Sequence, residues 1–169
     1  MAEREEEDKL YLRMYHDVCM EHVSAALERV VDAAEIPLRR VSEEESGRPA
    51  LPGGWSRKQV LGHLIDSASN NHQRFVRAAL ADALEFPAYD TPGSVRVQAV
   101  ASAAWPMLVD LWASYNRYLV HVIRRLPAAK LEVVCRIGSN APVSLGYLAE
   151  DYVRHLVHHL DRIGVATRS

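Results

Sequence analysis

Residues 54–75, GWSRKQVLGHLIDSASNNHQRF, carry the clearest structural signals of the chain. It opens with the signals of a helix N-terminus, because Ser56 is a suitable N-cap and the glutamine three residues later completes a capping box. The inward stripe that follows is interrupted by two small polar residues, Ser67 and Asn71. The pattern predicts an amphipathic helix from Ser56 to about Leu84, with room for a wet cavity beside its middle.

Three other segments show the three- and four-residue apolar spacing of amphipathic helices. The first ends where Pro37 interrupts the pattern, and Pro106 fits the first turn of the next. In the last, Ser144 is the expected N-cap, and Gly164 is expected to end the helix in a left-handed conformation. The expected bounds are Glu5–Ala34, a segment within Val97–Leu126, and Ser144–Gly164.

The connections between these helices are long. SEEES, residues 42–46, is expected to form one helical turn, and a short helix is expected over Ser94–Ala103. Residues 128–143 have a brief β-like pattern that indicates an extended or two-stranded excursion and not a true sheet. Four amphipathic helices without a convincing sheet predict an all-α four-helix bundle with long connections, and the length favours a single domain over residues 1–169.

Composition and charge argue against several classes of function. The net charge is −2 and no basic stripe is visible, which disfavours nucleic-acid binding. No apolar run approaches the ~18 residues that span a bilayer, and the acidic N-terminus, MAEREEEDKL, lacks the apolar stretch of a signal peptide. We therefore expect a cytoplasmic protein without membrane contact. Cys19 and Cys135 form no CxxC pair and are expected to pack as small hydrophobic residues.

Three histidines stand close together in YVRHLVHHLDRIG, residues 152–164. His155 and His159 are four residues apart, so in a helix their Cβ atoms lie ~5–6 Å apart on one face. That face also carries the apolar residues of the segment, whereas His158 shares its side with charged residues. The helical phase therefore directs His155 and His159 to the bundle interior, where they need hydrogen bonds or a metal, and His158 to the flank.

A metal held by this pair needs further ligands from a facing helix. His63 is the best candidate, because it follows the well-capped helix start and lies beside the small polar stripe. Asp66, three residues later, is a candidate to orient an imidazole or to act as a base. Three histidines from two helices leave positions open for water or substrate, which suggests chemistry, and imidazole suits zinc, nickel, iron or copper. The alternative ligands are His22, the strongest of them, and His16, His72 and His121.

At these residues the chain resembles the DinB-like superfamily of metal-binding bundles, and most closely its YfiT-like branch. The resemblance covers about Glu21 to Gly164. It implies a four-helix bundle of unusual connectivity, with a metal site made by one histidine of the second helix and a His-x-x-x-His pair of the last. By motif, these ligands are His63, His155 and His159. The segments that carry the resemblance are residues 54–75, AYD (88–90), LWASYNRYL (111–119) and YLAEDYVRHLVHHLDRIG (147–164).

The resemblance implies a metal-dependent enzyme, because relatives include thiol-dependent S-transferases, a thiol-dependent isomerase and proteins regarded as metal-dependent hydrolases. The first expectation is an S-transferase in which zinc, nickel or iron lowers the pKa of a low-molecular-weight thiol for attack on an electrophilic small molecule. Residues expected at the rim of its pocket are Asn71, His72, Arg74 and Tyr89.

Two other functions stay open. One is a hydrolase that uses metal-bound water, with Asp66, Glu150 or Asp151 as the base. The other is a non-enzymatic metal-binding module of a stress response. A homodimer is a further expectation for such a module. The aromatic residues of the third helix are candidates for core, pocket wall or dimer surface: Trp105, Trp112, Tyr115 and Tyr118.

Overall fold

Four long helices make up most of the structure, a computed structural model that describes residues 2–49 and 52–165, with side chains from residue 20 onward. The helices form an all-α four-helix bundle, as the sequence predicts. Their bounds are α1 (Ala2–Arg40), α3 (Arg57–Ala79), α5 (Trp105–Ile123) and α6 (Leu145–Arg162).

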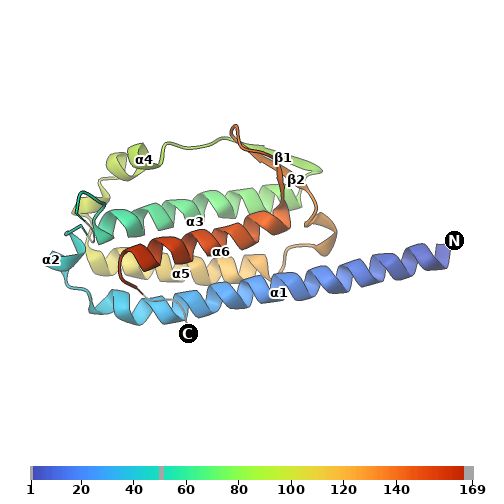
Figure 1. Ribbon diagram of the computed structural model, residues 1–169, viewed down its shortest axis with the longest axis horizontal. Helices are drawn as coiled ribbons and strands as arrows, with labels where there is room; N and C mark the ends of the chain where they lie inside the picture. Colours follow the sequence, from blue (N-terminus) through green and yellow to red (C-terminus); the bar gives the residue numbers. More distant parts are fainter. Residues whose placement is uncertain (1, 50–51, 166–169) are drawn as a thin grey trace.

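The bundle does not follow the simplest up-and-down order. The main contacts of α1 are with α5 and α6, and α3 packs against the same two helices. Two of the three pairs of consecutive long helices, α1 with α3 and α5 with α6, therefore occupy opposite corners, whereas α3 and α5 are neighbours. Figure 1 shows α3 and α5 running in one direction and α1 and α6 in the other. The antiparallel packing of α3 on α6 places the beginning of α3 beside the end of α6.

Short elements fill the connections. The one-turn helix expected at residues 42–46 is α2 (Glu43–Ser46), and the short helix expected at 94–103 is divided into α4 (Thr91–Val97) and the 3₁₀ turn η1 (Val100–Ser102). A second 3₁₀ turn, η2 (Ala128–Lys130), follows α5.

A small sheet corrects two sequence expectations. Its strands are β1 (Ala83–Phe86), β2 (Val134–Ile137) and β3 (Val143–Ser144); β1 pairs parallel with β2, and β2 antiparallel with β3. The predicted second helix stops at Ala79 because the chain soon enters β1, where Leu84 joins the buried core from a strand and not from a helix. The excursion at 128–143 is thus part of a true, three-stranded sheet. A local pattern does not reveal this sheet, because β1, the parallel partner of β2, lies about fifty residues earlier in the chain.

The predicted helix caps are confirmed. Ser56 accepts from the Gln59 amide while the Gln59 side chain accepts from the Ser56 amide, which completes the capping box. Ser144 caps α6 by accepting from the Tyr147 amide at 3.2 Å, and Gly164 follows the helix with a left-handed φ of 78°. These caps fix where α3 and α6 begin and end, and therefore which residues face each other across them.

The prediction that the first helix ends before Pro37 is wrong, since α1 continues to Arg40 with Pro37 inside it. A proline lacks the N–H of the helical hydrogen bond and crowds the preceding turn. Tertiary contacts offset this cost here: Leu38 is fully buried, and its carbonyl accepts the indole N–H of Trp105 at 2.9 Å. Arg39 adds an ion pair with Asp110 of α5 at 2.7 Å.

The core lies between the four helices and is rich in leucine, valine and aromatic residues. Trp105 and Trp112 are buried, so the core interpretation holds for the tryptophans, whereas Tyr115 is half-buried and Tyr118 is 52% exposed. Cys135 is buried and free, and burial raises the pKa of its thiol; the Cys19 side chain lies outside the described residues. Within residues 2–49 and 52–165, no helix combines the length and apolar character needed to cross a bilayer.

Candidate metal centre

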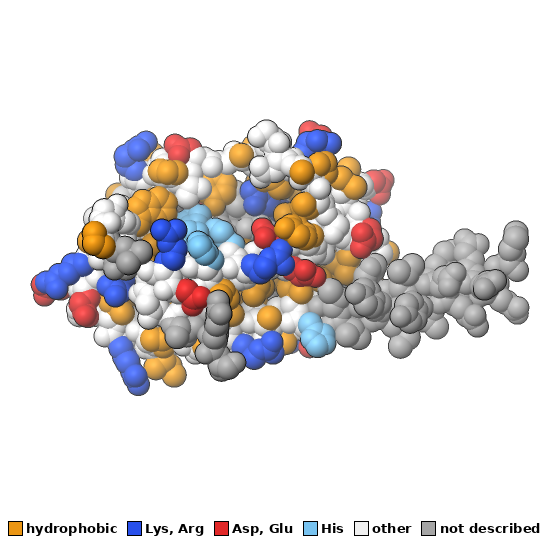
Figure 2. Space-filling model, viewed as in Figure 1, with side chains coloured by type: hydrophobic (Ala, Val, Ile, Leu, Met, Phe, Trp, Pro, Cys, Tyr) orange, Lys and Arg blue, Asp and Glu red, His pale blue; other side chains and the backbone are white. Residues whose placement is uncertain are grey.

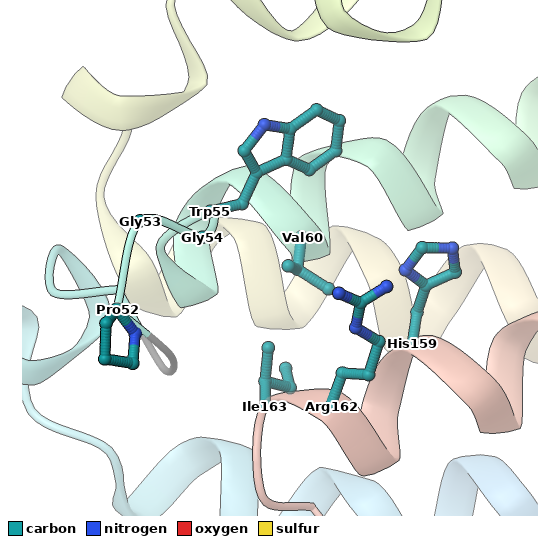
Figure 3. A pocket seen from close by; sticks show the side chains of 8 residues that line it. All are labelled: Pro52, Gly53, Gly54, Trp55, Val60, His159, Arg162 and Ile163. Carbon is teal, nitrogen blue, oxygen red and sulfur yellow. The ribbon is translucent and has the colours of Figure 1, made fainter.

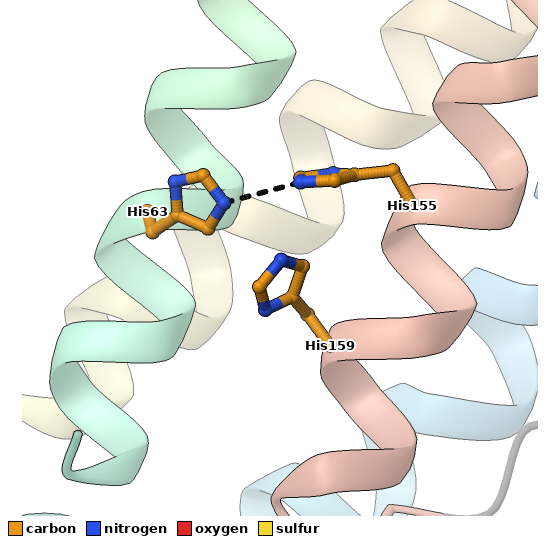
Figure 4. A group of neighbouring side chains, drawn as sticks. All are labelled: His63, His155 and His159. Carbon is orange, nitrogen blue, oxygen red and sulfur yellow. Dashed lines mark hydrogen bonds between the residues drawn. The ribbon is translucent and has the colours of Figure 1, made fainter. Parts of the chain in front are cut away.

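His63, His155 and His159 meet in the groove between α3 and α6. One ring nitrogen of each lies within 4.8 Å of the others, and Figure 4 shows the three rings converging on one point. The Nε2 atoms of His63 and His155 are 3.2 Å apart. His63 is only 5% exposed, and the other two are half-buried. Figure 2 shows histidine side chains in a hollow on this face of the molecule.

The donor geometry fits a divalent metal. Two nitrogens bound to one metal at ~2.0–2.1 Å lie roughly 2.9–3.4 Å apart for angles between octahedral and tetrahedral values. The 3.2 Å between His63 and His155 falls in this range. The third ring lies close enough to complete the set with a small adjustment of its side chain, since its ring centroid is 4.5 Å from that of His155 and 4.7 Å from that of His63.

The electrostatics of the site keep all three imidazoles neutral, which is the form that binds a metal. Burial, and then the neighbouring His155, lowers the pKa of His63 to about 4, while the Asp66 carboxylate opposes the shift. Burial, followed by the repulsion of His155 and His63, lowers the pKa of His159 to about 3. Burial likewise lowers the pKa of His155. At neutral pH, lone pairs are therefore available on all three rings.

The other histidines lie away from this point. His158 is exposed on the flank of α6, as the helical phase predicts, and His22, the strongest alternative ligand, is also exposed. His121 is exposed and its Nδ1 is 3.1 Å from the Arg125 guanidinium. His72 is half-buried and its Nδ1 lies 3.1 Å from the Tyr115 hydroxyl. The side chain of His16 is outside the described residues.

Asp66 is near the site but is not hydrogen-bonded to it. Its carboxylate is half-buried and close enough to raise the pKa of His63, yet the Nδ1 of His63 is buried without a hydrogen-bond partner among the residues that the structure describes. Supporting partners of metal-bound histidines usually occupy this position. The role of Asp66 as orienting group or base therefore stays a prediction.

Ser67 is a contributor that the sequence interpretation did not assign. Its Oγ lies 3.5 Å from Nδ1 of His155, and it accepts a hydrogen bond from the Asn71 amide at 3.3 Å. Arg74 in turn donates to the Asn71 side chain at 3.3 Å. The small polar stripe of the second helix, which the sequence associates with a wet cavity, is thus a polar line along α3 that ends at the His155 ring. The sequence pattern shows that Ser67 and Asn71 are small polar residues on an inward stripe, but it does not show that Ser67 lies beside His155.

A sequence model of the DinB superfamily matches residues 22–163. The chain belongs to the DinB superfamily. Among solved structures, YfiT from Bacillus subtilis has a similar fold, with 22% sequence identity over 90% of this chain and 83% of that chain and a TM-score of 0.62. YfiT is described as "a probable metal-dependent hydrolase with an unusual four-helix bundle topology". No curated protein matches the chain. The family and fold implied by the sequence motifs are therefore confirmed.

In this DinB-superfamily chain, a pocket of about 490 Å³ opens beside the histidines (Figure 3). His159 is in its wall, so the candidate metal centre communicates with it. The residues expected at the rim, Asn71, His72, Arg74 and Tyr89, are not among those that line this pocket. Its lining comes from the loop before α3 and the two facing helices: Pro52, Gly53, Gly54, Trp55, Val60, His159, Arg162 and Ile163.

Replacing Ser67 by alanine is expected to weaken metal binding by roughly tenfold, because a group that supports a ligating histidine contributes ~10–100-fold to affinity and this contact is long. Competition of the purified protein with a chromogenic chelator measures the change. Ser69→Ala is the matched control, since Ser69 is exposed on the same helix. Equal affinities of the two variants would show that Ser67 does not support His155.

The metal-free protein is expected to lose stability as the pH falls below about 6.5. The unfolded chain protonates His63 near its ordinary pKa of ~6.5, whereas the folded protein resists protonation until about pH 4. Between these values the unfolded state binds more protons, so the free energy of unfolding decreases with falling pH. Urea midpoints at pH 7.5 and 5 measure the slope, which should be shallower in His63→Asn; identical slopes would show that His63 is not the source of the pH dependence.

Proposed function

We propose that the chain is a metal-dependent enzyme, and a hydrolase in the first place, with His63, His155 and His159 as its metal ligands. The observation that carries the proposal is the convergence of three neutral imidazoles within 4.8 Å, with His159 also in the wall of a pocket of about 490 Å³. A three-histidine donor set leaves coordination positions for reacting groups, as in catalytic sites and unlike closed structural ones. The description of YfiT as a probable metal-dependent hydrolase supports the same reaction class.

The chain supplies orientation and a neutral donor set. His63 holds its ring on the rigid, well-capped second turn of α3, and Ser67 lies against the far nitrogen of His155. A bound divalent ion would supply a Lewis acid that makes a weak nucleophile reactive at neutral pH. Trp55 and Ile163 give the neighbouring pocket an apolar wall that displaces water from a substrate.

Asp66 is the carboxylate that we propose as general base. The Arg154 guanidinium pairs with both other candidates, with Glu150 at 3.5 Å and with Asp151 at 3.2 Å, although the Asp151 carboxylate also acts to raise the pKa of His155. Asp66 follows His63 by three residues on α3, so the two side chains leave the helix within one turn. The Asp66 carboxylate also acts to raise the pKa of His63.

A second candidate, transfer of a low-molecular-weight thiol to an electrophile, is favoured by one observation. The cluster of candidate ligands in the described chain contains three histidines and no carboxylate. A thiol that is bound to a metal is already deprotonated and needs no base beside it, whereas hydrolysis usually does. The arrangement therefore suits a thiol as well as water.

One experiment separates the candidates. The protein is stripped with a chelator and reloaded separately with zinc, nickel or ferrous iron, and each form is tested with a chromogenic aryl ester and with a model electrophile plus a thiol. Hydrolysis is expected in a loaded form without thiol, with no activity in the stripped protein or in His63→Ala.

Each other outcome has a definite meaning. Conjugation that requires the thiol, without hydrolysis, would replace the hydrolase by the transferase. Stoichiometric metal without either activity would favour the non-enzymatic module. A protein that takes up none of the three metals would overturn the site itself.

A further inference from the structure

The pocket beside the histidines has an unusual chemical lining. One wall is apolar, from Trp55, Val60 and Ile163, and the glycine loop before α3 closes one end. Arg162 is the single cation in the lining, and no carboxylate is present there among the described residues. Figure 3 shows Arg162 extending from α6 so that its guanidinium lies between Val60 and the His159 ring. The pocket therefore offers an apolar surface and one positive charge to a ligand.

Arg162 is exposed at the mouth of the pocket, and its charge has no ion-pair partner in the described part of the chain. Among residues 20–49 and 52–165, no carboxylate lies within ion-pair distance of its guanidinium. Arg154, two turns earlier on the same helix, differs in this respect because it pairs with Glu150 and Asp151. An arginine at the end of a helix also stabilises the helix dipole, but that role does not require the guanidinium to lie in a pocket.

The position of Arg162 relative to His159 limits the size of a ligand. The two residues are three apart on one helix, so their side chains leave the helix within one turn, roughly 5 Å along the axis. A group bound by the guanidinium is therefore only a few bonds from a group that reaches the histidines. A planar guanidinium binds the two oxygens of a carboxylate with paired hydrogen bonds, and its single positive charge matches the single negative charge of a carboxylate.

We infer that this pocket selects a small carboxylate with an apolar body, which pairs its carboxylate with Arg162, packs its body on Trp55 and Ile163, and presents its reacting group to His159. This inference rests on the proposed function only for the reacting group; the binding of the carboxylate does not require a metal. Arg162 is thus assigned as a specificity-determining residue of the site.

The test is the binding of phenylacetate and of phenylacetamide, which has the same shape without the charge, to the full chain in its metal-free form. Calorimetric titration is expected to give about tenfold tighter binding of phenylacetate. Arg162→Gln should remove this difference and leave the amide unchanged, and Arg162→Lys should retain part of it. Arg154→Gln is the matched control on the same helix and should behave as the unaltered protein.

Two results would overturn the inference: equal affinities for acid and amide in the unaltered protein, or a preference that persists in Arg162→Gln. If Arg162→Gln failed to fold, as judged by circular dichroism, Arg162→Lys decides, because a preference unchanged in that variant counts against bidentate pairing. Failure of the proposed function is recognised separately. If the chain took up no metal but still preferred the carboxylate through Arg162, the inference about the pocket would stand and the proposed metal-dependent activity would be refuted.

Discussion

Replacing His159 by alanine is expected to weaken metal binding by more than about a hundredfold, beyond the ~10–100-fold that the loss of a supporting group costs. The reason is that the variant keeps only His63 and His155, and two imidazoles are an incomplete set for a transition metal in a bundle. The measurement is metal content after dialysis, followed by titration against a competing chelator.

His158→Ala is the control for this variant, since it removes an adjacent histidine that is exposed on the flank of α6. It should bind metal as the unaltered protein does. Equal losses in the two variants would show that the whole segment matters and not the inward pair, and unchanged binding in His159→Ala would remove this residue from the site.

The second large effect concerns stability. Trp105→Ala is expected to lower the free energy of unfolding by about 3–5 kcal/mol, the usual cost of truncating a buried tryptophan. Trp105 is 2% exposed, its indole N–H donates to the Leu38 carbonyl, and its backbone amide donates to the Glu43 carboxylate at 2.8 Å. The side chain thus joins the start of α5 to the end of α1. Urea unfolding followed by circular dichroism measures the change.

Met107→Ala tests the same helix without the same burial, since Met107 is 52% exposed. A change within about 0.5 kcal/mol is expected there. Trp105→Phe separates packing from the hydrogen bond, because it retains an aromatic ring and loses the indole N–H. A loss in Trp105→Ala no greater than in Met107→Ala would refute the importance assigned to this contact.

The helices could be predicted because their signals are local. The capping box at Ser56 and the cap at Ser144 lie within four residues of the positions that they define. The sheet could not, because β1 and β2 pair across about fifty residues and each strand has only four residues. The continuation of α1 beyond Pro37 also depends on a distant partner, Trp105, that no local rule includes.

The same division applies to the candidate site. Helical phase alone separates His155 and His159 from His158, since neighbouring residues of one helix differ only in direction. The choice of His63 needed the assumption that α3 faces α6, which the structure bears out. The contact of Ser67 with His155 and the place of Arg162 in the pocket depend on side-chain positions across the groove, which a sequence does not contain.

The distance along the chain between His63 and His155, 92 residues, has a consequence for biosynthesis. At a translation rate of ~5–20 residues per second, the second histidine follows the first by roughly 5–18 s. During this interval a nascent chain has His63 without His155 and His159, so capture of a metal by the proposed three-histidine site would begin only after α6 has emerged and packed against α3. Metal uptake by a growing chain would therefore report the docking of α6, the helix that is synthesised last. The absorption band of bound cobalt would measure the time at which this docking occurs.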